Sequence, residues 1–342
     1  MDKMNSSEMQ ARNWLLQLIR GYISTQSIYV AAKLKIADYL ASGPRTSHEL
    51  AQRVGAHAPT LRRFLRGLAN LGVVEEYEAG AFNLTAVGQA LRSDVPGSLQ
   101  GAAVLTGELL YPVRAGLITA VQEGRTPVED YLGKPLFDYL SEQPELRELF
   151  HAGLAETKPN VAAAIARDFE IEDNCTVVDV GGGQGTLLAA ILAAHPRVQG
   201  ILFDRAEVLQ KASAGLTGVL DRVQLCSGDF FQSVPRGGDL YLLSWILHDW
   251  DDERATTLLK NCRNAMEAGR PGTRLLIIEA LAPDRVTRPS LAVELDLAML
   301  VLTGGQERTA QEYQALLQAA GLRLLRVYAI GDGRSVIEAG LP

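Results

Sequence analysis

Residues 177–185 of this chain read VVDVGGGQG, and the elements that they predict decide the fold of its C-terminal half. A short apolar run is followed by four glycines, and residues 187–194 then have the composition of a helix. Glycine allows the positive φ of a tight turn and a close approach of the backbone to a ligand. The order of strand, glycine loop and helix is typical of proteins that bind dinucleotides or other adenosine cofactors, although a plain tight turn has the same pattern.

Predicted strands and helices alternate on either side of this loop. The strands lie at residues 177–180, 200–203, 223–226, 239–244, 274–278, 322–330 and 335–339. Such alternation implies a mainly parallel sheet with helices on both faces. The last two strands are joined by a link as short as Gly331-Asp332-Gly333-Arg334, so they must form an antiparallel hairpin at the sheet edge. We therefore expect residues 168–342 to form one α/β domain of the Rossmann-like type.

The N-terminal half reads as mostly helical. Helical spacing of apolar residues predicts one helix over 14–40, and Thr46 with Glu49 forms a capping box ahead of a short helix. A further helix follows over 59–70, and residues 73–85 contain two short strands joined by a turn. Three helices and a hairpin in this order indicate a winged helix-turn-helix.

This pattern gives three expected segments. Residues 1–100 form the winged-helix-like domain, and residues 168–342 form the α/β domain. Between them, prolines break residues 101–167 into several linking helices.

Composition narrows the possible partners and compartment. Apolar residues make up 47% of the chain, charged residues 21%, and the net charge is −7, which is unfavourable for binding nucleic acid. No apolar run reaches the roughly 18 residues of a spanning helix, and the N-terminus lacks the order of a signal peptide. The three cysteines show neither metal-ligand nor redox spacing. We expect a cytoplasmic protein without a nucleic-acid or membrane partner.

Acids and an aromatic residue at the strand ends favour one kind of adenosine cofactor. Asp204 ends the second strand, where its carboxylate can accept both ribose hydroxyls. Asp229 and Phe230 follow the third strand, where an acid can receive the adenine amino group and a ring can cover the base. The fourth strand runs into SWILHDWDDE (244–253), which leaves no room for a second nucleotide. These residues predict a site for one adenosine with a compact tail.

Six motifs then occur in a familiar order. They are VDVGGGQG, FDRAEV, GDFF, LSWILHDWDDE, LLIIEALAPD and GGQERT. Together they resemble the S-adenosylmethionine-dependent O-methyltransferases of the caffeate and hydroxyindole type, and most closely the bacterial natural-product members. The resemblance implies a class I methyltransferase domain, an N-terminal dimerisation domain, S-adenosyl-L-methionine as cofactor, S-adenosyl-L-homocysteine as product, and no metal. It also implies transfer of the methyl group to a hydroxyl, phenolic in kind, of a small aromatic acceptor, and an acceptor pocket formed in part by the linking helices of 101–167.

The resemblance carries the cofactor contacts onto this sequence. Gly181 is expected against the methionine part, Asp204 at the ribose, and Asp229 with Phe230 at the adenine. Ser244 stands where the family often has lysine, so only a backbone contact is expected there. The full expected set is Gly181, Gly183, Asp204, Asp229, Phe230 and Ser244.

His248 is the expected catalytic residue. It lies just beyond the fourth strand, and the matching histidine of the family is the general base. With an ordinary pKa of about 6.5, it should be mostly neutral at pH 7 and able to take a proton from a phenol. The alternative is a structural histidine.

Other residues are expected around His248. Glu279 follows the fifth strand and Glu307 precedes the helix that begins at Thr309, so both acids lie at the same sheet edge and, by resemblance, orient the ring. Asp249 could assist His248 or border the cofactor. By resemblance, the helix with Met299 lines the acceptor pocket, although Met299 could equally be core.

Two other functions fit parts of the sequence. Winged-helix order, with Arg62, Arg63 and Arg66 on the third helix, would suit a ligand-responsive DNA-binding regulator. The same fold could also methylate nitrogen, or act as a decarboxylase or hydroxylase. For assembly we expect a homodimer, because the segment WLLQLI at 14–19 is unusually apolar for a chain end.

Overall fold

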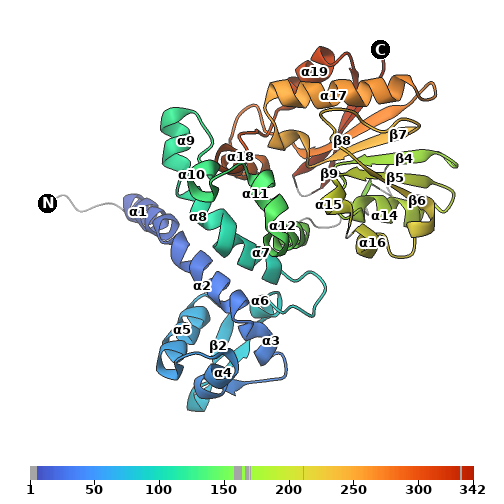
Figure 1. The fold of residues 1–342 in the computed structure, drawn as a ribbon. Helices are drawn as coiled ribbons and strands as arrows, with labels where there is room; N and C mark the ends of the chain where they lie inside the picture. Colours follow the sequence, from blue (N-terminus) through green and yellow to red (C-terminus); the bar gives the residue numbers. More distant parts are fainter. Residues whose placement is uncertain (1–5, 158–163, 166–168, 170, 211, 332) are drawn as a thin grey trace. The chain divides into compact units, whose positions relative to one another are not determined.

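The structure is a computed structural model that describes residues 6–157, 164–165, 169, 171–210, 212–331 and 333–342 (Figure 1). The chain separates into two compact units. Unit 1 contains Met1–Pro112 and Gln143–Lys158, and unit 2 contains Val113–Glu142 and Pro159–Pro342. The segment 101–167, expected as one linking region, is thereby shared between both units.

Unit 1 is built from helices around a small sheet. Its helices are α1 (Ser6–Ile19), α2 (Gly21–Lys33), α3 (Ile36–Leu40), α4 (Ser47–Val54), α5 (Ala58–Asn70), α6 (Ala86–Gln89), α7 (Gln100–Leu105), a π-helix (Thr106–Leu110) and α12 (Pro144–Glu156). Its strands β1 (Arg45–Thr46), β2 (Val74–Glu76) and β3 (Ala81–Leu84) form a sheet in the order β1-β3-β2. The capping box at Thr46 and Glu49 is confirmed, and so are α5 and the hairpin.

One expected helix is wrong. Residues 14–40 form parts of three helices, with breaks at Arg20 and at Leu34-Lys35. Lys35 has φ +52, a left-handed conformation that ends helical geometry. The apolar spacing continues across both breaks, because each short helix presents its own apolar residues at the same period, so the sequence pattern does not reveal them.

Unit 2 combines a few helices from the middle of the chain with the α/β domain. The first group contains α9 (Leu117–Glu123), α10 (Val128–Leu132) and α11 (Leu136–Glu142), preceded by α8 (Tyr111–Arg114) at the unit boundary. α9 packs against α18 (Leu291–Leu302). Length and composition alone would allow the helical run Gln100–Glu123 to cross a membrane, as they do for many helices packed inside proteins.

The sheet of unit 2 has seven strands in the order β6-β5-β4-β7-β8-β10-β9. They are β4 (Thr176–Val180), β5 (Gln199–Asp204), β6 (Val223–Ser227), β7 (Leu240–Ser244), β8 (Arg274–Ala280), β9 (Arg323–Gly331) and β10 (Arg334–Gly340). β4 to β8 are parallel, and β10 pairs antiparallel with β8 and β9. The expected parallel sheet with an antiparallel C-terminal hairpin is confirmed. The carboxyl ends of the parallel strands consequently meet at one edge.

Helices cover both faces of this sheet (Figure 1). One apolar core contains residues from α17 (Asp252–Glu267) and α19 (Ala310–Ala319), packed on alternate strand positions. The other contains residues from α14 (Thr186–Ala194) and from the segment of α15 (Ala206–Leu209) and α16 (Ala212–Gly215). Because both faces are buried, the central strands are nearly continuous apolar runs in the sequence, whereas the edge strands β6 and β9 are largely exposed. Short 3-10 helices lie at Glu78–Gly80, Leu220–Arg222 and Leu247–Asp249.

Candidate active site

The glycine loop leaves the carboxyl end of β4 and enters α14. Gly181, Gly183 and Gly185 all have positive φ, at +71°, +59° and +78°. The Gly181 N–H donates to the carbonyl of Phe203, 2.8 Å away, which ties the loop to β5. A Cβ on Gly181 would lie 2.6 Å from Cδ1 of Ile246, so the loop also packs closely on the segment that follows β7. Glycine is required here for both conformation and space.

Asp204 lies beside this loop at the end of β5. Its Oδ2 accepts the N–H of Gly183 at 2.8 Å and its Oδ1 accepts the N–H of Arg205 at 2.7 Å. Burial raises the pKa of this carboxyl, and the two backbone hydrogen bonds oppose that effect. Each carboxylate oxygen has a second lone pair, so Asp204 can still accept hydroxyl groups of a ligand.

Asp229 and Phe230 follow β6 at the same edge. Asp229 accepts the N–H of Phe231 at 2.9 Å, and Asn261 of α17 donates to the carbonyl of Phe230 at 2.9 Å. Cε1 of Phe230 would be 3.6 Å from a Cβ on Gly181, so the ring lies against the glycine loop. The structure therefore brings Gly181, Gly183, Asp204 and Phe230 together.

An aromatic cluster borders this region. The Trp250 ring packs edge-on against Phe231 and Phe230, with centroids 4.8 and 6.1 Å apart, and contacts Phe137 at 5.7 Å. The guanidinium of Arg254 lies 5.0 Å from the Trp250 ring centroid. The sequence did not predict Trp250 and Phe137 at this place. The only signal was the presence of Trp250 itself as the second tryptophan in the motif at 243–253.

These residues fit S-adenosylmethionine. The loop offers backbone that only glycine permits, Asp204 offers acceptors for the ribose, and Phe230 offers an apolar face for the adenine. Ser244, half-buried at the end of β7, lies at the same edge through its pairing with Ile278.

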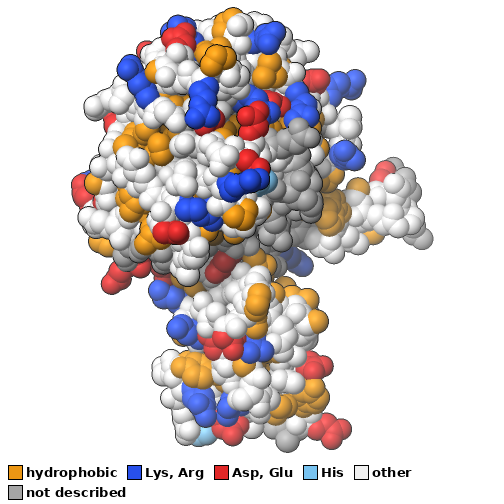
Figure 2. All heavy atoms as spheres, turned by 90° about the vertical axis from the view of Figure 1, so that its right-hand side faces the viewer, with side chains coloured by type: hydrophobic (Ala, Val, Ile, Leu, Met, Phe, Trp, Pro, Cys, Tyr) orange, Lys and Arg blue, Asp and Glu red, His pale blue; other side chains and the backbone are white. Residues whose placement is uncertain are grey.

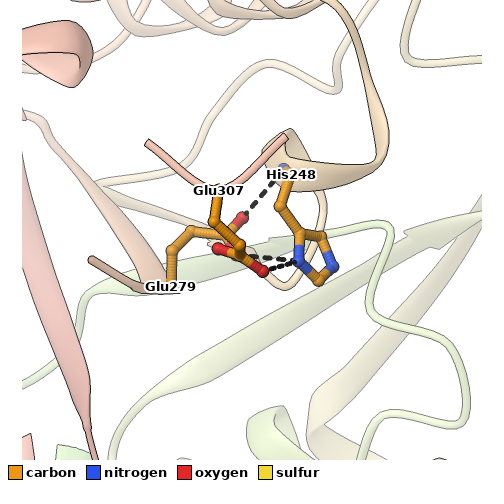
Figure 3. A group of neighbouring side chains, drawn as sticks. All are labelled: His248, Glu279 and Glu307. Atoms are coloured by element: carbon orange, nitrogen blue, oxygen red, sulfur yellow. Dashed lines mark hydrogen bonds and ion pairs between the residues drawn. The ribbon is translucent and has the colours of Figure 1, made fainter. Parts of the chain in front are cut away.

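His248 lies in the short helix Leu247–Asp249, and two glutamates hold it (Figure 3). Its Nδ1 lies 2.6 Å from Oε1 of Glu307 and 3.8 Å from Oε2 of Glu279. The other Glu279 oxygen accepts the N–H groups of Ile246 and Leu247, at 3.1 and 3.0 Å. Glu279 thus fixes the backbone of the histidine loop, while Glu307 fixes the ring.

This geometry selects one nitrogen of the ring. A hydrogen bond to a carboxylate places the proton on Nδ1, so in the neutral ring Nε2 carries the free lone pair. Figure 3 shows the Nε2 edge pointing away from Glu279 and Glu307. Asp249 lies on this side, with Oδ1 3.8 Å from Nε2. His248 is buried and can accept a proton at Nε2.

The expectation that His248 is mostly neutral at pH 7 is wrong. Burial lowers the pKa of the ring, but the charges of Glu279 and Asp249 and the hydrogen bond that Nδ1 donates to Glu307 together outweigh burial and raise it to about 9. Burial and the neighbouring acids also raise the pKa of Glu279, which His248 opposes. The free protein therefore holds an imidazolium at neutral pH.

Trp245 lies on the other side of the imidazole. Its ring contacts that of His248 edge-on, with centroids 5.2 Å apart, and the guanidinium of Arg334 lies 5.2 Å from the Trp245 ring. Trp245 has φ +59°, which is rare for a residue with a large side chain. Sequence reasoning missed this residue, because backbone strain leaves no mark in composition.

Two further observations concern expected residues. Met299 is buried in α18 and accepts a contact from the Thr303 hydroxyl, at 3.5 Å from its sulfur. The nearest nitrogen and carboxylate oxygens of His248, Glu279 and Glu307 lie within 4.8 Å of one another, a grouping that the sequence spacing did not reveal and that could in principle hold a metal ion. Two atoms of these side chains already have hydrogen-bond partners: Nδ1 of His248 donates to Glu307, and Oε1 of Glu279 accepts the N–H of Leu247.

Comparison with known proteins agrees with this site. The O-methyltransferase domain family model matches residues 115–323, and the O-methyltransferase dimerisation domain model matches residues 16–94. The chain is 44% identical to phenazine O-methyltransferase PhzM of Lysobacter antibioticus over 95% of both chains. It is 38% identical to O-demethylpuromycin-O-methyltransferase of Streptomyces alboniger, covering 94% of this chain and 87% of the relative.

Solved structures extend the similarity to the cofactor. LaPhzM has a TM-score of 0.90 at 43% identity, covering 96% of this chain and 98% of that one. Human N-acetylserotonin methyltransferase, solved with S-adenosylmethionine, has a TM-score of 0.88 at 29% identity, covering 99% of each chain. Some relatives carry other activities, namely an N,N-dimethyltransferase of Streptomyces davaonensis at 34% identity and aclacinomycin 10-hydroxylase of Streptomyces purpurascens at 33%. With its sheet order, its glycine loop and its cofactor, this chain belongs to the S-adenosylmethionine-dependent O-methyltransferase family.

Proposed function

We propose that the protein methylates a phenolic hydroxyl of a small aromatic natural product, with His248 as general base. The observation that carries this proposal is the imidazole of His248, whose Nδ1 bonds to Glu307 and whose Nε2 points away from both glutamates. Bound S-adenosylmethionine would supply a methyl group already activated on a sulfonium. Gly181, Gly183, Asp204, Asp229 and Phe230 would hold it at the sheet edge.

The acid-base chemistry of His248 suits a phenol. A phenol has a pKa of about 10, and a base with a pKa near 9 can take its proton with little free-energy cost. Glu307 keeps the proton of Nδ1 in place and stabilises the imidazolium that forms, while Glu279 keeps the loop fixed. The remaining task is to align the acceptor oxygen, and fixed geometry contributes much of the rate in such transfers.

Two other proposals accompany this reaction. We propose a homodimer, supported by the match to the dimerisation domain and by the exposed apolar residues of α1. The DNA-binding alternative is weaker, because Arg62 and Arg66 both pair with Glu76, at 3.9 and 3.1 Å. Basic and acidic side chains are also interspersed over the face shown in Figure 2. A cytoplasmic location remains our proposal from the sequence.

A panel experiment tests the reaction. The purified protein is incubated with S-adenosylmethionine and matched pairs of acceptors, each phenol beside its aniline and its methyl ether. We expect a gain of one methyl group by mass spectrometry on the phenols only. Methylation of the anilines instead would support the N-methylating alternative, and an oxygenated or decarboxylated product would support the remaining ones.

A further inference from the structure

Arg308 is the largest side chain with no exposed surface among the residues that the structure describes. Its Nη1 donates to the carbonyl of Leu247 at 3.0 Å, and its Nη2 donates to the carbonyl of Trp250 at 2.7 Å. Nε and Nη2 also donate to Oδ1 of Asp252, at 3.0 and 2.8 Å. Leu247 and Trp250 stand on either side of His248 in the chain. The buried charge therefore binds the carbonyls that flank His248.

The same short segment is bound from its other side by Glu279. The carboxylate accepts N–H groups of Ile246 and Leu247, and Arg308 donates to carbonyls of Leu247 and Trp250. A carboxylate thus accepts the N–H groups at the start of this segment, and a guanidinium donates to two of its carbonyls. Charge-assisted hydrogen bonds are roughly twice as strong as neutral ones, so this segment has little freedom to move.

Arg308 also follows Glu307 directly in the chain. Their shared loop lies against the histidine backbone, because a Cβ on Gly305 would come 2.0 Å from the carbonyl oxygen of His248. The guanidinium therefore connects the two partners of the 2.6 Å contact between Nδ1 and Glu307. Movement of Arg308 would change the position of the carboxylate and the ring together.

We propose that Arg308 is a positioning residue for methyl transfer, which holds His248 and Glu307 in register through the carbonyls of Leu247 and Trp250. This inference rests on the proposed role of His248 as the base. Lysine could not replace the arginine, because one ammonium cannot span two carbonyls and a carboxylate in a fixed planar arrangement.

The test compares Arg308→Lys with a matched control. Arg326→Gln removes another arginine that pairs with a carboxylate, 3.0 Å from Glu338, on edge strand β9. For the fastest phenol of the acceptor panel, we expect kcat of Arg308→Lys to fall about 10- to 100-fold, which is less than the roughly 10²- to 10⁴-fold cost of losing the general base outright. The Kd of S-adenosylhomocysteine, measured by calorimetry, should stay within about threefold in both variants. The control should keep its kcat.

Two readouts separate positioning from a general loss of folding. In protein labelled with ¹³C-histidine and assigned with His248→Gln, the His248 titration midpoint of Arg308→Lys should fall toward 6.5, because the ring loses its fixed carboxylate partner. In the His248→Gln background, Arg308→Lys should reduce kcat no further, because both changes remove one function. An unchanged kcat and midpoint in folded Arg308→Lys would overturn the proposal, and so would an equal further loss in that background.

A second variant serves if Arg308→Lys does not fold. Asp252 orients the guanidinium, yet its side chain is 66% exposed, so Asp252→Ala should fold. We expect a roughly three- to tenfold lower kcat, because Arg308 loses both hydrogen bonds to an acceptor that is largely exposed but keeps those to the carbonyls of Leu247 and Trp250, and an unchanged value would contradict the proposal. If His248→Gln alone keeps full turnover, His248 is not the base and the proposed function fails. The His248 titration midpoint in Arg308→Lys still tests the positioning by Arg308 separately.

Discussion

The basicity of His248 is set by its carboxylate neighbours. Three acids from three parts of the chain surround a buried ring, and their charges outweigh the cost of burying an imidazolium. A stronger base removes a phenolic proton more easily, but a smaller fraction of it is neutral at pH 7. The raised pKa therefore makes His248 a stronger base but lowers the fraction of it that is neutral at pH 7. Both effects can be measured by the pH dependence of the rate.

The first prediction concerns the ring itself. His248→Gln should lower kcat by about 10²- to 10⁴-fold, because general-base help is lost while the surrounding backbone is kept. Affinity for S-adenosylhomocysteine, followed by calorimetry, should change little. His195→Gln, which alters a histidine at the end of α14, serves as the control. A variant with turnover near that of the wild type would show that alignment alone suffices.

The second prediction concerns pH. Because the folded pKa of His248 is raised to about 9, kcat/KM should rise with pH from 6 and level off near 9. In the rising part, each pH unit should give about a tenfold increase, since the neutral fraction grows by that factor. Initial rates in overlapping buffers measure the profile, and His248→Gln should lack this rise. A wild-type profile that levels off near 6.5 would mean that the carboxylates do not raise the pKa.

At the scale of elements, parallel strands place the cofactor residues. Asp204, Asp229 and the glycine loop lie far apart in sequence, yet each follows a parallel strand and so reaches the same edge. These side chains do not need to contact one another to form a site, because the register of the parallel strands places all of them at one sheet edge. A substitution at the end of one of these strands should consequently weaken cofactor binding more than it slows the methyl-transfer step.

The third prediction follows from this placement. Asp204→Ala should weaken binding of S-adenosylhomocysteine by roughly 10- to 100-fold, because buried hydroxyls of the ribose would lose a charged acceptor. Isothermal calorimetry measures the change, and Asp221→Ala, in a short helix before β6, is the control. Affinity equal to that of the wild type would remove Asp204 from the ribose site.

Sequence reasoning succeeded where one local signal was enough. The strands were visible because buried apolar runs end at glycine or acid residues, and α4 and α19 were visible through their capping boxes. The breaks at Arg20 and Lys35 were not visible, because the helical period continues across them. The pKa of His248 depends on Glu279 and Glu307, which are distant in sequence. Arg308 was missed because an arginine in a loop is usually solvated.

At the scale of the whole molecule, α1 is a helix whose apolar side chains stay largely uncovered within the described chain, although it contacts α2. It has no buried residue, and Trp14, Leu15, Leu18 and Ile19 are all more than half exposed. Isolated helices of this length are marginal in water, so such a helix needs apolar surface to pack against. The match to the dimerisation domain, which begins at residue 16, supports a second copy of this chain as that surface.

The fourth prediction therefore concerns assembly. The full-length protein should be a dimer at micromolar concentration by light scattering, and deletion of residues 1–20 should shift it toward the monomer. The expected cause is loss of the apolar surface of α1 from the interface. Trp14→Ala with Leu18→Ala tests the same surface without truncation. A monomeric full-length protein, or a truncated protein that stays dimeric, would contradict this role of α1.

The hold on residues 246–250 also bears on how such enzymes diversify. Glu279 and Arg308 hydrogen-bond to peptide groups, which remain in every substitution of the side chains in this segment except those to proline. Helices elsewhere in unit 2, such as α9 and α18, which pack against each other, can then change in size and polarity while His248 keeps the hydrogen bonds that hold its segment. Separating a conserved reaction from a variable specificity in this way makes a scaffold evolvable. On the proposed function, changes in such helices would alter which acceptor fits without moving His248.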